Sequence, residues 1–270
     1  MLLTASRDIE AATRAAELVV LVHQRIAEFL RAGRTLAEID AVVGRTLKEN
    51  RARSCFHRYK IPGHPPFPSQ SCLSVNECVV HGTHVMSEEP IKPGDLVSVD
   101  VGVRLDGWIG DAAWTYGIEA VDEVGHRLME SGIESLRAGV AAMQPGRPLM
   151  DWARAVQERV ETQDGFHLVR GLGGHGYGKT LHAPPFVSNV VPSGPGEWPD
   201  GWTSFRPGQL IAVEPMIAVS TPEITSRRGE WPIFTADGSL SVHYEADVLI
   251  TDEGPRNLTE AMFDLPSIVG

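Results

Sequence analysis

Two segments of the chain repeat each other at a nearly constant distance along its 270 residues. The sequence KPGDLVSVDVG at 92–102 matches RPGQLIAVEPM at 206–216, an offset of 114 positions. Upstream, GRTL at 33–36 matches GRPL at 146–149, an offset of 113. One such match would be unremarkable, but two at nearly one offset indicate a duplicated unit. Because two copies are too few for a solenoid, we expect two halves packed face to face about a pseudo-twofold axis.

Each half is predicted to hold a pair of helices followed by a β-hairpin. The helices carry apolar stripes at helical spacing, and TLAE at 35–38 has the form of a capping box. We expect the repeat at about 6–116 and 120–250, within one domain over 1–270. The predicted elements are helices at 6–31, 35–50, 122–143 and 148–163, a hairpin at 92–116, and strands at 73–76, 79–81, 210–219, 231–236 and 240–250.

The predicted hairpin carries one aspartate on each arm, Asp100 and Asp111. Valines at alternate positions from 97 to 103 point to one face, and Asp100 shares the other face with small residues. A four-residue loop at 104–107, whose Asp-Gly tolerates positive φ, would set Asp100 directly opposite Asp111. Carboxylates this close are destabilising unless a cation lies between them. Taken alone, however, such a pair is more often two solvated acids on a half-exposed hairpin.

The second half places two more acids in the same setting. Glu214 lies on the predicted strand at 210–219 and Glu245 on that at 240–250, both flanked mostly by small or apolar residues. A pseudo-twofold axis would gather these two with Asp100 and Asp111 at one centre. Four carboxylates cannot stay ionised together in a cleft without cations, so the pattern predicts a two-metal site.

Three histidines are candidates for the same site. His175 lies in GGHGYG, where the glycines permit close approach of backbone and substrate. An imidazole added to carboxylates shifts the choice of metal towards Mn, Fe, Co or Zn. His81 in VVHGTH and His182 in TLHAPP are further candidates, as ligands or as donors to an oxyanion. Each of them singly is more often a core or surface residue. The glycine run lacks the GxxxxGK[ST] form of a phosphate loop.

Composition narrows the class of protein. A net charge of −11 argues against a general nucleic-acid binder, and three cysteines without metal-binding spacing are typical of a reducing cytosol. Neither a signal peptide nor a membrane-spanning segment is visible in the sequence. We therefore expect a cytoplasmic protein.

Five motifs in this order resemble type I methionine aminopeptidases of the bacterial kind: NECVVHG, SVDVGVRLDGWIGDAAWTY, GGHGYGKTLHAPPFV, AVEPMI and HYEADVLIT. The resemblance covers about 5–260. It implies the α+β pita-bread fold, in which helices cover a curved antiparallel sheet in two related halves. It also implies removal of the N-terminal methionine from nascent proteins and peptides, preferably before a small second residue, by a hydroxide activated by two divalent metal ions.

The resemblance implies how five residues would hold these ions, which could be Mn, Fe(II), Co or Zn. Asp100, Asp111 and Glu245 would hold one ion. Asp111, His175, Glu214 and Glu245 would hold the other, so that Asp111 and Glu245 bridge the pair.

The resemblance also implies roles around the metals. Glu214 would act as the catalytic proton shuttle, and His81 and His182 would contact the substrate. Ala183 and Asp247 depart from the family pattern, which usually has an acid and a threonine-like residue there. The side chains that align with walls of the methionine pocket are Phe67, Cys72, Leu181 and Trp231, and His64 stands at a pocket position where the family often has a tyrosine.

Two other functions are possible for a chain with this fold. An X-prolyl aminopeptidase or prolidase shares the fold but carries a large N-terminal domain, which is not expected here. A non-catalytic pita-bread protein would bind a peptide without metal, but such proteins generally lose ligands that are all present here. We expect nascent polypeptide N-termini as partners, with the ribosome as one place where they could be met. We further expect a monomer, and no contact with membranes or nucleic acid.

Overall fold

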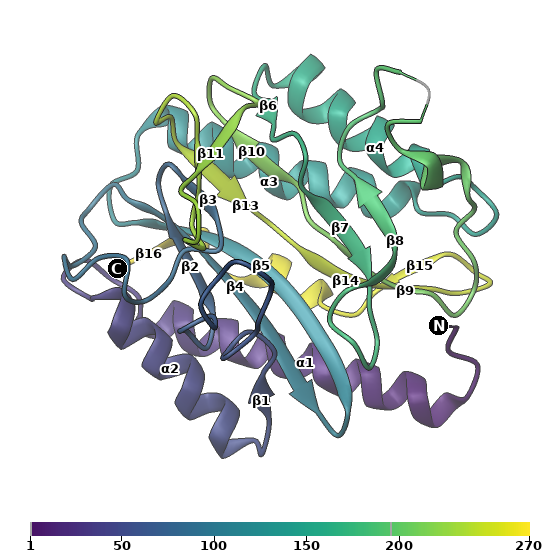
Figure 1. Ribbon diagram of the computed structural model, residues 1–270, viewed down its shortest axis with the longest axis horizontal. Helices are drawn as coiled ribbons and strands as arrows, with labels where there is room; N and C mark the ends of the chain where they lie inside the picture. The colour runs from purple at the N-terminus through teal and green to yellow at the C-terminus, as the bar shows by residue number, and fades with distance from the viewer. Residues whose placement is uncertain (1, 195) are drawn as a thin grey trace.

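The computed structural model describes residues 2–194 and 196–270 and contains two five-stranded sheets (Figure 1). The first has the order β1-β4-β5-β16, with β2 also paired to β4; all its pairs are antiparallel except β5–β16. The second is antiparallel with the order β15-β14-β9-β7-β8. The strands of the first are β1 (Arg53–Ser54), β2 (Cys72–Val75), β4 (Leu96–Leu105), β5 (Trp108–Ile118) and β16 (Ile268–Val269), and those of the second are β7 (Gly173–Gly176), β8 (Ala183–Ser188), β9 (Leu210–Val213), β14 (Ala246–Ile250) and β15 (Pro255–Asn257).

Strands β4 and β5 form the predicted hairpin, but with a different register. Leu105 pairs with Trp108, so only Asp106 and Gly107 form the turn, and both have positive φ, as two-residue hairpins favour. Asp100 therefore faces Ala113, and Asp111 faces Gly102. The prediction that the two aspartates stand directly opposite is wrong; they are diagonal neighbours on the same face of the hairpin.

The two large sheets meet where β5 runs beside β14. The amide of Glu245 donates to the Ala113 carbonyl at 2.9 Å. In the other direction, the Asp111 amide donates to Asp247 Oδ2 at 2.8 Å. These two bonds bring Asp111 from the first half of the chain next to Glu245 from the second.

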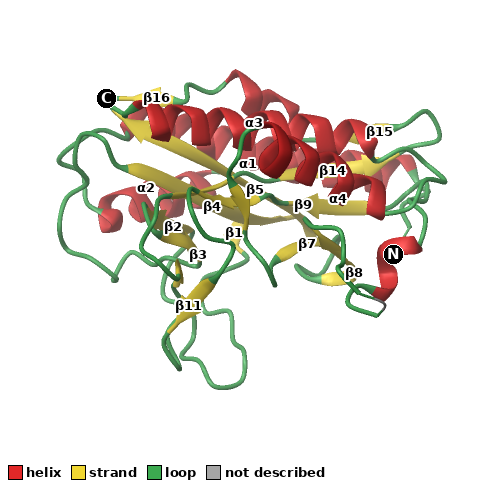
Figure 2. Cartoon of the chain, turned by 90° about the horizontal axis from the view of Figure 1, so that it is seen from above, coloured by secondary structure: helices red, strands yellow, loops and turns green. Residues whose placement is uncertain are grey.

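Four α-helices lie on one side of the sheets, and the opposite side carries short strands and loops (Figure 2). Thr35 and Glu38 form the predicted capping box at the start of the second helix. The predicted apolar face of β4, including Val99 and Val101, is fully buried beneath the helices. The helices are α1 (Ser6–Phe29), α2 (Leu36–Glu49), α3 (Glu123–Ala142) and α4 (Met150–Gln157), and α4 continues as a π-helix over Glu158–Gln163.

The long strands predicted in the second half are each interrupted. The strand predicted at 210–219 divides into β9 and β10 (Met216–Ala218) around Glu214-Pro215, and that at 240–250 divides into β13 (Ser241–His243) and β14 around Tyr244-Glu245. Two three-stranded sheets use the remaining strands, in the orders β13-β10-β6 and β11-β12-β3. These elements are β3 (Cys78–Val80), β6 (His167–Leu168), β11 (Ile224–Ser226) and β12 (Ile233–Thr235), with 3₁₀ turns at Pro199–Trp202 and Glu260–Asp264.

The α+β prediction is confirmed. Within the described residues, none of the helices is both long and apolar enough to cross a membrane.

Candidate metal centre

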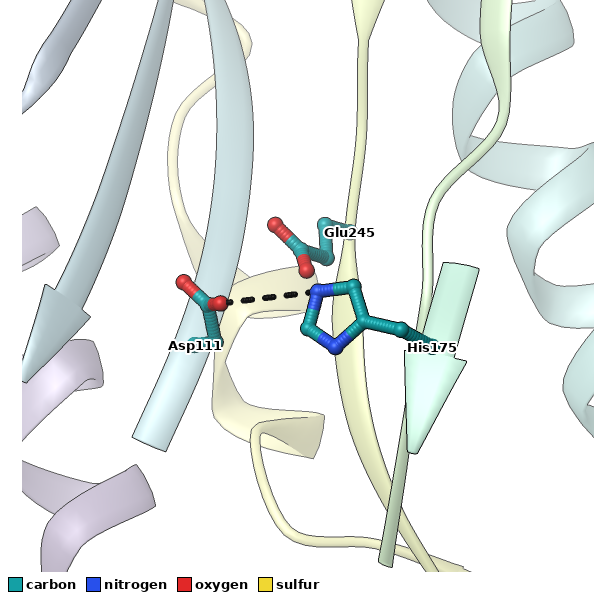
Figure 3. A group of neighbouring side chains, drawn as sticks. All are labelled: Asp111, His175 and Glu245. Atoms are coloured by element: carbon teal, nitrogen blue, oxygen red, sulfur yellow. Dashed lines mark ion pairs between the residues drawn. The ribbon is translucent and has the colours of Figure 1, made fainter. Parts of the chain in front are cut away.

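Three of the predicted ligands converge where the two sheets meet. Asp111 on β5, His175 on β7 and Glu245 before β14 each offer one ligand atom, and these atoms lie within 4.8 Å of one another. Figure 3 shows the three side chains pointing toward one another, with His175 Nε2 3.9 Å from Asp111 Oδ2. Carboxylate oxygens and an imidazole nitrogen form a donor set suited to borderline divalent ions.

The other two predicted ligands face the same centre. Glu214 Oε1 lies 3.9 Å from His175 Nε2, the same nitrogen that approaches Asp111. Asp100 and Glu214 line both of the cavities that open at this centre. The chain therefore brings all five predicted metal-binding side chains to one place.

Burial makes these carboxylates unfavourable as isolated anions. It raises the pKa of Asp100 to about 7, against the opposing effect of nearby His243. Burial, followed by the neighbouring acids, raises the pKa of Asp111 and of Glu245 well above the usual range. The Oδ1 atoms of Asp100 and Asp111 are buried without a hydrogen-bond partner among the described residues. Divalent cations would satisfy both the charge and these orphaned oxygens, so the residues fit a metal centre.

Glycines fix the strands that carry two of the histidines. A Cβ on Gly174 would lie 2.3 Å from the Ala212 carbonyl oxygen, so only glycine lets β7 approach β9 and present His175. A Cβ on Gly82 would lie 2.0 Å from the Leu73 carbonyl oxygen. The preceding His81 has a φ of +58°, a sparsely populated conformation that turns its side chain toward the centre.

His81 and His182 lie beside the carboxylate cluster. Burial lowers the pKa of His81 to about 4, so its ring is neutral near pH 7. Burial, followed by the neighbouring His175, lowers the pKa of His182, whose ring stands edge-on to that of His175 at a centroid distance of 4.5 Å. Tyr59 Oη lies 3.1 Å from His182 Nδ1 and steadies the ring from the other side. Both histidines can therefore offer neutral N–H groups to a substrate.

A cavity of about 340 Å³ opens on one side of the cluster. Four of the predicted pocket residues line it: Phe67, Cys72, Leu181 and Trp231. His64 instead packs against Trp231, at a ring distance of 5.0 Å, and is not part of the lining among the described residues. The sequence did not single out three further wall residues, Phe56, Tyr59 and Ile61. Their only signal was the aromatic and proline-rich composition of the segment at 55–70.

A second, wider cavity of about 610 Å³ shares Asp100, His175 and Glu214 with the first. Its outer walls come from the glycine-rich segment, β8 and the turn at Pro199–Trp202, through Leu172, Phe186 and Asp200. Ala183, one of the two departures from the family pattern, also lines this cavity. The cluster thus stands between an enclosed aromatic pocket and an open groove.

Asp247, the other departure, is buried behind the cluster. Its Oδ2 accepts the Asp111 amide, while its Oδ1 has no hydrogen-bond partner in the described part of the chain. The Tyr177 hydroxyl lies close by, and burial raises the pKa of Asp247 well above its usual range. The sequence indicated no role for this residue, because a strand pattern does not reveal which backbone amide a carboxylate meets.

A cluster of carboxylates and one imidazole, set between an apolar pocket and a groove, defines a metal-dependent hydrolase. The sequence model of metallopeptidase family M24 matches residues 10–252. The chain belongs to this family.

Proteins with similar sequences are methionine aminopeptidases, the family that the motifs resemble. The chain is 35% identical over 257 residues to methionine aminopeptidase 1 of Mycobacterium tuberculosis, covering 93% of this chain and 92% of the relative. It is 34% identical to methionine aminopeptidase of Aquifex aeolicus, covering 96% and 98%. The resemblance to methionine aminopeptidases is confirmed.

Solved structures agree as well. Methionine aminopeptidase from Thermotoga maritima superposes with a TM-score of 0.86 at 32% identity, covering 96% of this chain and 99% of that chain. Prolidase from Pyrococcus furiosus gives a TM-score of 0.72 at 21% identity, with 65% of its chain covered, and shows the shared fold alone. The predicted pita-bread fold is confirmed.

Proposed function

We propose that this chain is a metalloaminopeptidase that removes the N-terminal methionine from nascent proteins and peptides. The observation that carries the proposal is that all five predicted ligands line the same pocket as the aromatic side chains. An unbranched methionine side chain suits this pocket, since its thioether makes favourable contacts with aromatic rings such as Phe67 and Trp231. The names of the relatives support the same activity.

The five ligands would hold two divalent ions, with Asp111 and Glu245 shared between them. Such ions lower the pKa of a bound water and polarise a carbonyl oxygen. Oxygen and nitrogen donors admit Mn, Fe(II), Co or Zn.

The remaining chemistry belongs to the chain's own side chains. Glu214 takes a proton from the attacking water and delivers it to the leaving amine. His81 and His182, as neutral imidazoles, donate hydrogen bonds to the carbonyl oxygen and the leaving nitrogen of the first peptide bond. The groove past Phe186 and Asp200 takes the polypeptide that follows the scissile bond. The preference for a small second residue rests on the resemblance to methionine aminopeptidases.

The wider setting of the enzyme follows from these roles. We place it in the cytoplasm, where nascent N-termini emerge from ribosomes, and regard residues 1–270 as one catalytic domain built from two related halves. A monomer would suffice, because all five ligands come from one chain.

Replacement of Glu214 tests this function. Glu214→Gln should lower turnover of a Met-Ala-Ser peptide by about 10²–10⁴-fold, the usual contribution of a general acid–base group. Glu253→Gln is the matched control, because Glu253 is exposed and lines neither cavity. The products are measured by mass spectrometry in the presence of each divalent ion. Full activity of Glu214→Gln, or an inactive wild type with every ion, would refute the proposal.

A further inference from the structure

We infer that His243 is a positioning residue for Glu214: its Nε2–H holds one carboxylate oxygen and leaves the other for the metal cluster. The inference rests on the proposed function, because it assigns a role to a neighbour of the proton shuttle. His243 ends β13, two residues before Glu245, and only 3% of its surface is exposed.

The distances divide the two oxygens of Glu214 between two imidazoles. Oε2 lies 3.4 Å from His243 Nε2, while Oε1 lies 3.9 Å from His175 Nε2. His243 Nε2 is buried and makes no hydrogen bond within the described residues, so its 3.4 Å approach to Glu214 Oε2 is an ion-pair distance without hydrogen-bond geometry. A buried donor needs an acceptor, and the nearest candidate is the Glu214 carboxylate.

The main chain on both sides of this contact is fixed. Asn189 donates from its side-chain amide to the Glu214 carbonyl at 2.9 Å. The Thr115 hydroxyl donates to the His243 carbonyl at 2.9 Å and accepts from the His243 amide at 3.1 Å. Thr115 belongs to β5, in the first half of the chain. A residue of the first half therefore positions the His243 ring beside Glu214, which belongs to the second half. Neither residue can easily shift away from the other.

His243 also lines the open groove, together with its strand partner Met216. The groups that face it are Asp100, Glu214 and His81. Within the part of the chain that the structure describes, Glu214 forms ion pairs with His175 and His243 and with no lysine or arginine. A carboxylate that is held at one oxygen loses rotational freedom at the other. Replacement of the residue that holds a metal ligand typically changes metal affinity or activity by about 10–100-fold.

Three substitutions of His243 test whether Glu214 needs a hydrogen-bond donor at the position of Nε2. His243→Gln keeps an amide N–H near the position of Nε2, His243→Asn is too short to reach it, and His243→Leu fills the space without a donor. We expect His243→Asn and His243→Leu to lower kcat on Met-Ala-Ser by about 10–100-fold, with KM changed less than about threefold. His243→Gln should recover most of this loss. His126→Leu, an exposed histidine on α3, should leave kcat unchanged.

Calorimetry of the metal-free proteins with Mn²⁺ provides a readout that is independent of activity. His243→Asn and His243→Leu should still bind two ions, with the Kd of one ion weakened by about 10–100-fold. The inference is overturned if folded His243→Leu keeps wild-type kcat and affinity, or if His243→Gln is as impaired as His243→Leu. Loss of one whole ion in His243→Asn would make His243 a ligand instead. An inactive wild type that still binds two ions would remove the proposed function but not the effect on affinity.

Discussion

At the scale of single residues, the site depends on carboxylates that burial disfavours as anions. Asp100, Asp111 and Glu245 are buried together, and burial raises the pKa of each. In the metal-free protein they prefer to hold protons, so metal ions and protons compete for the same oxygens. Metal binding should therefore strengthen as the pH rises toward neutrality.

The raised pKa of Asp100 determines in which direction its contribution to stability changes with pH. Its folded pKa of about 7 exceeds that of the unfolded chain, so between about pH 4 and about pH 7 the folded state binds more protons. The contribution of Asp100 to the stability of the metal-free protein must then fall as the pH rises through this window. The buried His23 and His81 act in the opposite direction, because their pKa values are lowered to about 4.

Comparison with Asp100→Asn cancels those histidine contributions. Metal-free wild type should lose free energy of unfolding relative to Asp100→Asn as the pH rises from about 4 to about 7. Urea unfolding at several pH values in the presence of a chelator measures the difference. A difference that is flat or rises over this range would contradict the burial argument.

At the scale of elements, the sequence predicted the strands and helices better than their breaks. Alternating valines identified the buried face of β4, and the capping box located the start of α2. The hairpin register failed because a two-residue and a four-residue turn share the same Asp106-Gly107, and pairing of Leu105 with Trp108 decides between them. Pro215 was the overlooked signal for the break after Glu214, since proline cannot donate within a sheet.

The candidate site was predictable to the extent that it lies on regular strands. The four acids stand on or beside strands, so the duplication predicted their convergence, whereas the place of His175 among them followed from the family motifs. Phe56, Tyr59 and Ile61 lie in an irregular segment whose side-chain directions no period reveals. The strand pattern placed His243 on the same face as Glu245, but it could not show the contact with Glu214, which lies on a different element.

Gly174 offers a test of how closely β7 must approach β9. Gly174→Ala would place a Cβ 2.3 Å from the Ala212 carbonyl oxygen, so the strands must separate. We expect a loss of about 1–3 kcal/mol in stability, as for other overpacked sites, together with weaker metal binding through displaced His175. Gly194→Ala is the control, because a Cβ added there would meet nothing within 4 Å. Equal unfolding midpoints for the two variants would argue against close strand contact.

The turn at Pro199–Trp202 offers a test of the groove. Asp200 lines the groove, and neither lysine nor arginine does so among the described residues. If the polypeptide leaves by this route, Asp200→Lys should raise kcat/KM for a Met-Ala-Ser-Glu peptide relative to Met-Ala-Ser-Lys, by a few-fold as for an exposed charge pair. The exposed Asp252→Lys, outside the groove, should leave the ratio unchanged. An unaltered ratio in Asp200→Lys would exclude this path.

At the scale of the whole molecule, the site exists because two halves of one chain meet along β5 and β14. The first half supplies Asp100 and Asp111, and the second supplies His175, Glu214 and Glu245. The aromatic pocket and the groove share lining residues at this meeting point, among them Asp100, His175 and Glu214, so under the proposed function a substrate would have a methionine end and an exit end there. Neither half alone supplies all five of the proposed ligands.

Crystals soaked with Mn²⁺ or Co²⁺ test this account most directly, by anomalous scattering. We expect two peaks: one bounded by Asp100, Asp111 and Glu245, the other by Asp111, His175, Glu214 and Glu245. Peaks elsewhere on the chain, or saturating metal with no peak between Asp111 and Glu245, would contradict the account.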